Sequence, residues 1–189
     1  MALDLFAKQG YSETTVDQIV SATGVTKGAF YYYFKSKDQV LELLHDQFLE
    51  YEMSMAEQVR KSSGNPREKL RLMVHDLIQS IVIYRKNVVV FFQEVDRLPP
   101  ERRAQIEERR RVYQTQIEDL IRSGIELGVF HRDLDPVITT LGIFGLCNYT
   151  YRWLDPNGRL SVTEVADRLA SLLLDGMAGT NEVARELQS

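Results

Sequence analysis

Side-chain caps at the starts of helices recur along this chain and constrain its fold more than any other feature. Thr15-Val16-Asp17-Gln18, Ser36-Lys37-Asp38-Gln39 and Ser161-Val162-Thr163-Glu164 each match the capping box, in which two side chains satisfy free backbone N–H groups reciprocally. Asn65-Pro66 and Asp135-Pro136 place a capping side chain before a proline suited to the first helical position. These signals predict a chain that folds almost entirely as α-helix.

The caps and the apolar periodicity together predict nine helices. Their ranges are 2–9, 15–23, 26–32, 36–62, 66–84, 87–97, 100–127, 136–153 and 162–178. Val88-Val89-Val90-Phe91-Phe92 has the residue types of a strand, which is the alternative there, but it has no partner run. We therefore expect an all-α fold.

The composition argues against several classes of protein. The 189 residues carry a formal net charge of −4, which argues against a protein that coats nucleic acid without regard to sequence. No apolar run approaches the roughly 20 residues of a membrane span, and the first residues lack the pattern of a signal peptide. The single Cys147 excludes an internal disulfide and fits a buried thiol in a reducing compartment. We expect a cytoplasmic protein with no membrane partner.

A glycine turn joins two of the short N-terminal helices. Gly24 permits the left-handed backbone that turns helix 15–23 sharply into helix 26–32. This arrangement is the helix-turn-helix signature, whose second helix enters the major groove of DNA by its N-terminal end. Six apolar residues at helical spacing are expected to form its small core: Leu5, Phe6, Ile19, Val20, Val25 and Phe30.

The second helix of the pair has residues suited to DNA. Thr26-Lys27-Gly28-Ala29 is small or flexible throughout, which permits close approach to base edges. Tyr31 and Tyr33 project sideways, where phenols can donate to phosphate oxygens, and Lys37 stands at the start of the next helix. The alternative is that the consecutive tyrosines form a packed aromatic cluster.

The stretch from Gly10 to Thr15 and the stretch from Gly24 to Lys37 resemble the DNA-binding domain of TetR-family transcriptional regulators. The resemblance covers nearly all of that domain and implies an N-terminal three-helix helix-turn-helix domain at residues 1–45. It also implies a C-terminal helical ligand-binding and dimerisation domain at residues 46–189, with the helix from Ser36 transmitting ligand binding to the head. The positions that it implies face DNA are Thr15, Thr26, Lys27, Gly28, Ala29, Tyr31, Tyr33 and Lys37.

The last two predicted helices are the most apolar of the chain. Apolar residues cover most of the circumference of helix 136–153, so that helix must be buried nearly all round. Gly142 and Gly145 leave a smooth patch that permits close approach of another helix. We therefore expect a two-fold homodimer that forms through these two helices.

The segment Asn148–Ser161 resembles a subset of these regulators that control lipid or steroid catabolism and respond to acyl-CoA thioesters. For such an effector, Arg152 is a candidate phosphate ligand, and Tyr149 and Trp153 are candidates to stack on adenine. The candidates to line an acyl channel are Phe91, Phe92, Tyr113 and Phe144. The alternative is an ion pair for Arg152 and core or interface positions for the aromatic residues.

An enzyme is the main competing class. Glu42-Leu43-Leu44-His45 has the Glu-x-x-His spacing of a di-iron bundle, but such a site needs a second copy, which the sequence lacks. No zinc-protease motif or glycine-rich phosphate loop occurs. A purely structural helical dimer is the second alternative, and it has no need of Lys27 or the phenols. We expect no catalytic residue, metal or cofactor, and instead a repressor that a small molecule, for which a CoA thioester is the candidate, releases from an inverted-repeat operator.

Overall fold

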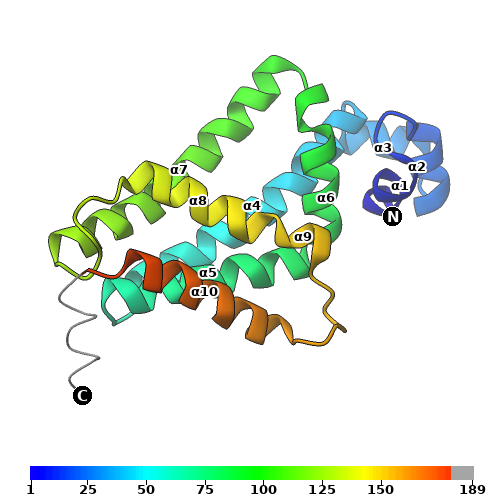
Figure 1. Cartoon of the computed structure of the whole chain (residues 1–189). Helices are drawn as coiled ribbons and strands as arrows, with labels where there is room; N and C mark the ends of the chain where they lie inside the picture. The colour runs from blue at the N-terminus through cyan, green and yellow to red at the C-terminus, as the bar shows by residue number, and fades with distance from the viewer. Residues whose placement is uncertain (180–189) are drawn as a thin grey trace. The chain divides into compact units, whose positions relative to one another are not determined.

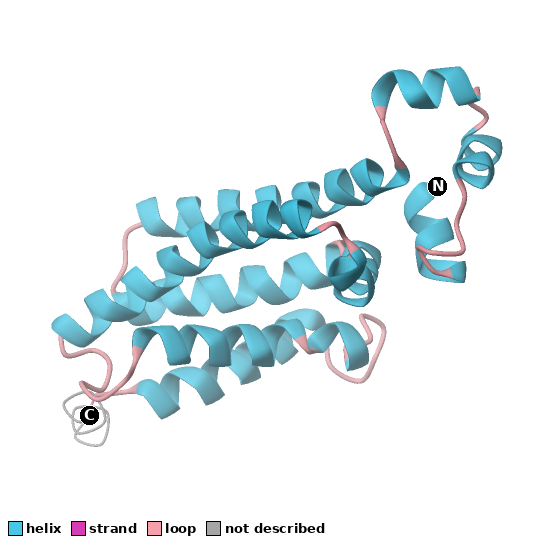
Figure 2. Ribbon diagram, turned by 90° about the horizontal axis from the view of Figure 1, so that it is seen from above, coloured by secondary structure: helices cyan, strands magenta, loops and turns pink. Residues whose placement is uncertain are grey.

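The computed structural model describes residues 1–179, apart from the side chain of Arg97, and these residues form helices and loops (Figures 1 and 2). The helices are α1 (Ala2–Gln9), α2 (Val16–Thr23), α3 (Lys27–Tyr33), α4 (Lys37–Lys61), α5 (Pro66–Ile83), α6 (Arg85–Glu94), the 3₁₀-helix η1 (Val95–Arg97), α7 (Pro100–Glu126), α8 (Pro136–Asn148), α9 (Thr150–Trp153) and α10 (Val162–Met177). The only β-pairing among the described residues is an isolated bridge between Phe130 and Ala178. The predicted all-α fold is confirmed.

Most of the predicted caps start the helices. The Thr15 and Ser161 capping boxes are both complete, and the Asp135 carboxylate accepts hydrogen bonds from the backbone N–H groups of Val137 and Ile138. Asn65 and Glu68 exchange side-chain and backbone hydrogen bonds in the same reciprocal pattern. Because these contacts lie within one turn, local sequence is enough to fix where the helices begin.

Two details of the prediction were wrong. At Ser36 no capping box forms: Gln39 accepts from the backbone N–H of Lys35, and the Ser36 hydroxyl donates to Asp38. The expected helix 136–153 is two helices, since α8 ends at Asn148, and the Thr150 hydroxyl donates to the Cys147 carbonyl at this break. The run 88–92 lies within helix α6, so the predicted helix is confirmed there and the strand alternative is excluded.

The chain divides into two compact units that are not contiguous in sequence. The first unit is Met1–Tyr51 with Tyr84–Glu107, and the second unit is Glu52–Ile83 with Glu108–Ser189. Helices α4 and α7 therefore each contribute residues to both units. The predicted domain boundary at residue 45 stays a prediction.

The first unit has one apolar core, to which α1–α4, α6 and α7 contribute. Its fully buried members include Phe6, Ile19, Phe30 and Leu41, and Leu5 and Val20 pack at its edge. Val25 was expected in this core, but 46% of its surface is exposed, because it follows the Gly24 turn on the outside of the domain. The remaining buried members are Tyr11, Val40, Val90, Phe91, Leu98 and Ile106.

The second unit is built around α5, which packs against α8, α9 and α10. Leu70, Val74 and Ile78 of α5 are completely buried. Two polar contacts fasten α10 to α5: Arg67 forms an ion pair with Asp175 at 2.7 Å, and the His75 ring forms a hydrogen bond with Asp167 at 3.0 Å. Among the described residues, no helix is long and apolar enough to cross a membrane.

A close contact between α7 and the loop that follows it yields a test of the second unit. A Cβ atom added at Gly124 would lie 2.1 Å from Phe130 Cδ2, and Phe130 is 1% exposed. We predict that Gly124→Ala lowers the free energy of unfolding by about 1–3 kcal/mol, because overpacking forces neighbouring atoms to shift. Urea unfolding measures the change.

Gly28→Ala is the matched control. Gly28 is also helical, and a Cβ added there meets only the Thr26 hydroxyl oxygen, at an ordinary contact distance of 3.9 Å. Alanine is favoured over glycine within a helix by about 0.5–1 kcal/mol, so this variant is expected to be as stable as the wild type or more stable. Equal stability of the two variants would contradict the account of the Gly124–Phe130 contact.

Candidate functional site

The turn between α2 and α3 positions the candidate DNA-reading helix. Gly24 has a φ of 72°, in the left-handed region, and ends α2. The Thr26 hydroxyl then accepts a hydrogen bond from the backbone N–H of Ala29 at 3.1 Å and starts α3. Phe30 is 5% exposed and joins the core, so the register of α3 is fixed and its opposite face is turned outward.

The outward face of α3 carries the residues predicted to contact DNA. Residues 26–29 are all exposed, and so is Thr15 at the start of α2. Tyr31 and Tyr33 are 50% and 74% exposed, although each ring also meets a neighbouring ring edge-on: Tyr31 meets Phe30 and Tyr33 meets Tyr32. Lys27 pairs with Asp17 at 2.7 Å on the surface, where both side chains are mostly exposed. The structure thus brings seven of the eight predicted DNA residues to the surface of the helix-turn-helix.

Lys37 is held differently from the other seven. Its ammonium group donates to the backbone carbonyls of Tyr11, Ser12 and Thr14 at 2.8, 3.1 and 3.0 Å, and it lies 4.4 Å above the centre of the Tyr11 ring. The Tyr11 hydroxyl in turn donates to Asp38. Burial and this carboxylate raise the pKa of Tyr11. These contacts fasten the loop after α1 to the start of α4 and favour a structural role for Lys37 over the predicted phosphate contact.

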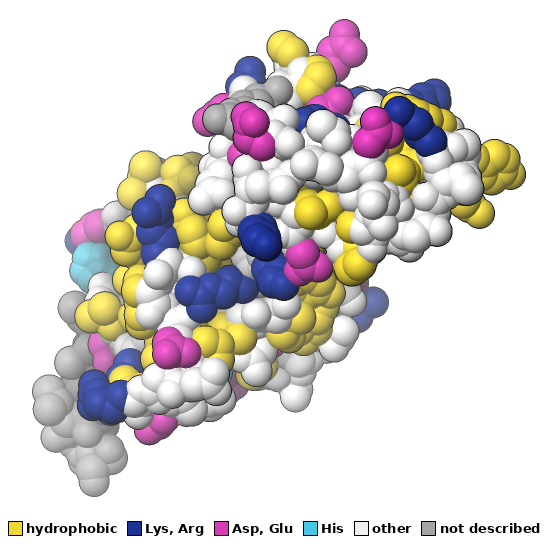
Figure 3. Space-filling model, turned by 90° about the vertical axis from the view of Figure 1, so that its right-hand side faces the viewer, with side chains coloured by type: hydrophobic (Ala, Val, Ile, Leu, Met, Phe, Trp, Pro, Cys, Tyr) yellow, Lys and Arg dark blue, Asp and Glu magenta, His cyan; other side chains and the backbone are white. Residues whose placement is uncertain are grey.

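Basic and acidic side chains are interspersed on the surface. The face drawn in Figure 3 carries Lys and Arg side chains beside Asp and Glu side chains, among hydrophobic and uncharged ones. A sequence-specific DNA-binding protein needs only a few cations close to the phosphates, because charge interactions act over short distances at physiological salt.

The structure divides the predicted effector residues into three groups. In the first unit, Phe91 is buried and stacks on His45 with ring centres 3.9 Å apart, and Phe92 meets the edge of Phe91. In the second unit, Tyr113 and Phe144 stack with ring centres 5.6 Å apart. The third group, Tyr149, Arg152 and Trp153, is exposed at the end of α8 and on α9.

Arg152 does not form the carboxylate ion pair that was the alternative for it. Its Nε donates to the Tyr151 hydroxyl at 3.1 Å, and the guanidinium lies over the Tyr151 ring. No carboxylate pairs with it among the described residues, so its charge remains exposed. Its role as a phosphate ligand stays a prediction.

Sequence reasoning missed a buried polar group inside the second unit. Glu52 on α4 is 7% exposed and accepts a hydrogen bond from the Ser80 hydroxyl on α5 at 3.3 Å. Burial raises the pKa of Glu52 to about 7, against the attraction of Arg110 and the hydrogen bond from Ser80. A signal was available, since Leu49, Glu52 and Ala56 lie three and four residues apart on one buried helix face.

Three hollows in the described part of the second unit bear on the candidate site. A groove of about 250 Å³ lies between α4, α5 and α7, and its lining residues include Ala56, Met73 and Gln116. Beyond Met73 and Ala56 lies a space beside Glu52 and Tyr113 that is too narrow for a water molecule. The third hollow, of about 440 Å³, is at the turn after α7.

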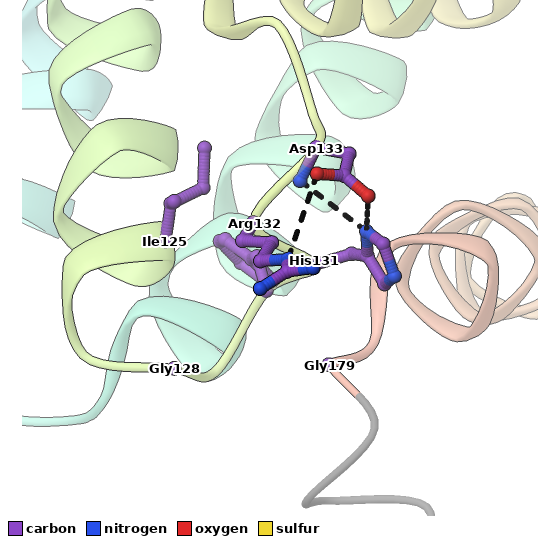
Figure 4. Close-up of a pocket in the computed structure, with 7 residues that line it drawn as sticks. Ile125, Gly128, His131, Arg132, Asp133 and Gly179 are labelled. Atoms are coloured by element: carbon purple, nitrogen blue, oxygen red, sulfur yellow. Dashed lines mark hydrogen bonds and ion pairs between the residues drawn. The ribbon is translucent and has the colours of Figure 1, made fainter.

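The third hollow lies beside the turn that follows α7, as Figure 4 shows. His131 and Asp133 point toward each other, and the His131 ring accepts from the backbone N–H of Asp133 at 3.3 Å. Gly128, with a φ of 72° in the left-handed region, follows the end of α7. Among the described residues, no group of three or more His, Cys, Asp or Glu side chains is placed to hold a metal ion.

The comparisons with known proteins agree with this geometry. Residues 1–44 match the family of bacterial regulatory proteins named after tetR, and residues 63–177 match the tetracyclin repressor-like C-terminal domain. The chain belongs to the TetR family. It is a helix-turn-helix transcriptional regulator, as the resemblance in its sequence implied.

Several relatives match this TetR-family chain over most of their own length. The HTH-type transcriptional repressor KstR2 of Mycobacterium tuberculosis is 28% identical over 178 residues, which cover 94% of this chain and 89% of that protein. The structure of that ketosteroid transcriptional regulator matches with a TM-score of 0.83, over 94% of this chain and 91% of the other. The fatty acid metabolism regulator protein of Bacillus subtilis is 24% identical over 177 residues, which cover 93% of this chain and 91% of that protein.

A further similar structure contains a coenzyme A thioester and operator DNA together. AibR in complex with isovaleryl coenzyme A and operator DNA has a TM-score of 0.79 and 26% identity to this chain, covering 92% of this chain and 94% of AibR. These relatives are transcriptional regulators, and the enzyme alternative finds no support among them.

Burial of Glu52 predicts a pH dependence of stability in this TetR-family regulator. Its pKa is about 7 in the folded chain against an ordinary value of 4.5. Between these values the folded chain keeps a proton that the unfolded chain releases, so stability falls as pH rises from about 4.5 to 7. Glu52→Gln has no titratable carboxyl at this position and does not lose this stability. Its free energy of unfolding relative to that of the wild type is therefore expected to increase by about 3 kcal/mol between pH 4 and pH 8.

Urea unfolding at several pH values tests this prediction. Glu126→Gln, at an exposed position of α7, is the control and is expected to follow the wild type. A difference between Glu52→Gln and wild type that is the same at all pH values would contradict the buried, proton-holding carboxyl.

Proposed function

We propose that this TetR-family chain is a repressor that binds an inverted-repeat operator as a homodimer and is released by an acyl-CoA thioester. The observation that carries the DNA part is the exposed N-terminal face of α3, held by the Gly24 turn and by Phe30. A helix that enters the major groove by its N-terminal end presents these first residues to base edges. Two copies related by a two-fold axis then read two half-sites of opposite direction.

An exposed apolar face supports the homodimer. Ile138 and Leu141 of α8 and Leu172 of α10 are 67%, 49% and 64% exposed, although α8 buries Thr140, Ile143 and Cys147 on its other face. The expectation that α8 is buried nearly all round therefore does not hold within one chain. Gly142 and Gly145 have open space beside them, which permits close approach of a partner helix. We infer that a second copy covers this face.

The relatives support the class of effector. AibR was solved with isovaleryl coenzyme A and operator DNA together, and another relative is named as a fatty acid metabolism regulator. An apolar interior with the Tyr113–Phe144 stack suits an acyl group. Helix α4 contributes residues to both units, so we infer that a displacement of its second-unit part is transmitted to the first unit.

Selection from a random DNA pool tests the operator part. The wild-type dimer is expected to select an inverted repeat, and Lys27→Ala is expected to change the base preference, because a major-groove lysine contacts base edges. Tyr31→Phe is expected to weaken binding to every selected sequence about fivefold, through loss of one phosphate hydrogen bond of about 1 kcal/mol. A folded wild-type dimer that selects no sequence at physiological salt would refute the proposal.

Lys37→Met serves as the comparison variant, because the ammonium group of Lys37 donates to three backbone carbonyls, whereas methionine cannot. It is expected to lower the melting temperature and to leave the salt dependence of DNA binding unchanged. A salt slope reduced by about one unit, with unchanged melting temperature, would instead make Lys37 a phosphate contact.

Sedimentation tests the homodimer. The wild type is expected to be a dimer at micromolar concentration, and Gly145→Leu is expected to shift it toward monomer, since added bulk at a packed contact costs about 1–3 kcal/mol. Gly28→Leu is the control, because Gly28 is exposed on α3 of the first unit. A monomeric wild type would overturn the interface.

Calorimetry tests the class of effector. Acyl-CoA thioesters of several chain lengths are expected to bind the wild type at micromolar or lower concentration and to bind more tightly than the matching free acids. The reason is that a charged phosphate adds hydrogen bonds worth about 1.5–3 kcal/mol each. If no thioester binds below high micromolar concentration, the effector class is wrong.

A further inference from the structure

An exposed carboxylate lies among the residues that are predicted to contact DNA. Asp17 is in the first turn of α2, and its side chain is 69% exposed. Asp17 Oδ1 lies 2.7 Å from the Nζ atom of Lys27, the first residue of α3. Because DNA phosphates are negative, a carboxylate on this surface opposes binding to DNA of any sequence, so its presence calls for a reason.

Stability of the fold does not supply that reason. Lys27 is itself 57% exposed, and ion pairs between exposed side chains contribute little to stability. The two helices are held by the buried side chains of Ile19 and Phe30, and each helix begins at its own side-chain cap. The ion pair therefore bears on the behaviour of Lys27 rather than on the fold.

Pairing with Asp17 restricts both the position and the charge of Lys27. A lysine ammonium is a compact charge on a flexible four-carbon stem, and the hydrogen bond to Asp17 holds it beside the first turn of α2. This hydrogen bond and the attraction of the carboxylate raise the pKa of Lys27, so the ammonium stays protonated. An ammonium group has three N–H donors, so two of them remain for acceptors on a base edge.

Taking the operator binding of the proposed function as given, we propose that Asp17 is a positioning residue that sets the specificity of Lys27 for base edges over phosphates. The ion pair has no net charge, so Lys27 releases fewer counterions on contact with a phosphate than a free lysine does. Its remaining donors still form directional hydrogen bonds with acceptors such as the N7 and O6 atoms of guanine. Asp17 therefore lowers the affinity for non-operator DNA more than the affinity for the operator.

Asp17→Asn tests this role, because it removes the charge and keeps the size of the side chain. Fluorescence anisotropy measures binding to the operator that the wild type selects and to a random-sequence duplex of the same length. The ratio of the operator affinity to the random-duplex affinity is expected to fall about fivefold, and the salt slope for the random duplex is expected to steepen by about one unit. Repulsion between Asp17 and phosphates is common to both duplexes and cancels in the ratio.

Three further variants separate positioning from a general effect of charge. Glu101→Gln removes an exposed first-turn carboxylate from α7 in the same unit, and it is expected to keep the wild-type ratio. Asp17→Glu keeps the charge within reach of the flexible lysine, so it is also expected to keep that ratio. In a Lys27→Ala background, Asp17→Asn is expected to leave the ratio unchanged, because Asp17 acts through Lys27. Circular dichroism checks that every variant is folded.

A wild-type ratio in Asp17→Asn would overturn the positioning role. So would an equal fall of the ratio in the wild-type and Lys27→Ala backgrounds, because Asp17 would then contact a base itself. In both cases the proposed function survives, because the wild type still selects an operator. If the folded wild-type dimer selects no sequence, the proposed function fails first, and the role of Asp17 fails with it.

Discussion

The left-handed backbone at Gly24 is the constraint on which the DNA-reading surface depends. It ends α2 and lets the chain reverse direction within two residues, after which the Thr26 hydroxyl starts α3. Phe30 then anchors α3 in the core of the first unit, so Lys27 and its neighbours are held outward on a short, rigid helix. A side chain at Gly24 would be strained whatever the surrounding space, because φ is 72° there.

Helix α4 contributes residues to both units. Near its start, Leu41 belongs to the core of the first unit, and Lys37 and Asp38 hold the loop after α1. Further along, Glu52 and Ala56 line the interior of the second unit. The proposed coupling of effector binding to DNA binding depends on this helix, whose backbone is continuous from one unit to the other.

Local sequence predicted the parts of the fold that local contacts determine. The caps at Thr15, Asp135 and Ser161 were readable, because each is completed within three residues. The break after α8 was not, since the hydrogen bond from Thr150 to the Cys147 carbonyl competes with a helix that the sequence allows to continue. The importance of Glu52 also escaped prediction: its helix face could be inferred from the spacing of Leu49, Glu52 and Ala56, but its partners Ser80 and Arg110 lie far away in sequence. The exposed face of α3 could be inferred only through the helix-turn-helix pattern.

The most direct test of the account is release of operator DNA by the effector. Fluorescence anisotropy of a labelled operator, isolated by selection with the wild-type dimer, would be followed while an acyl-CoA that binds the protein is added. The account predicts that anisotropy falls to the value of free DNA near the dissociation constant of the thioester, with no response to free CoA. Anisotropy that stays constant at saturating thioester would contradict it.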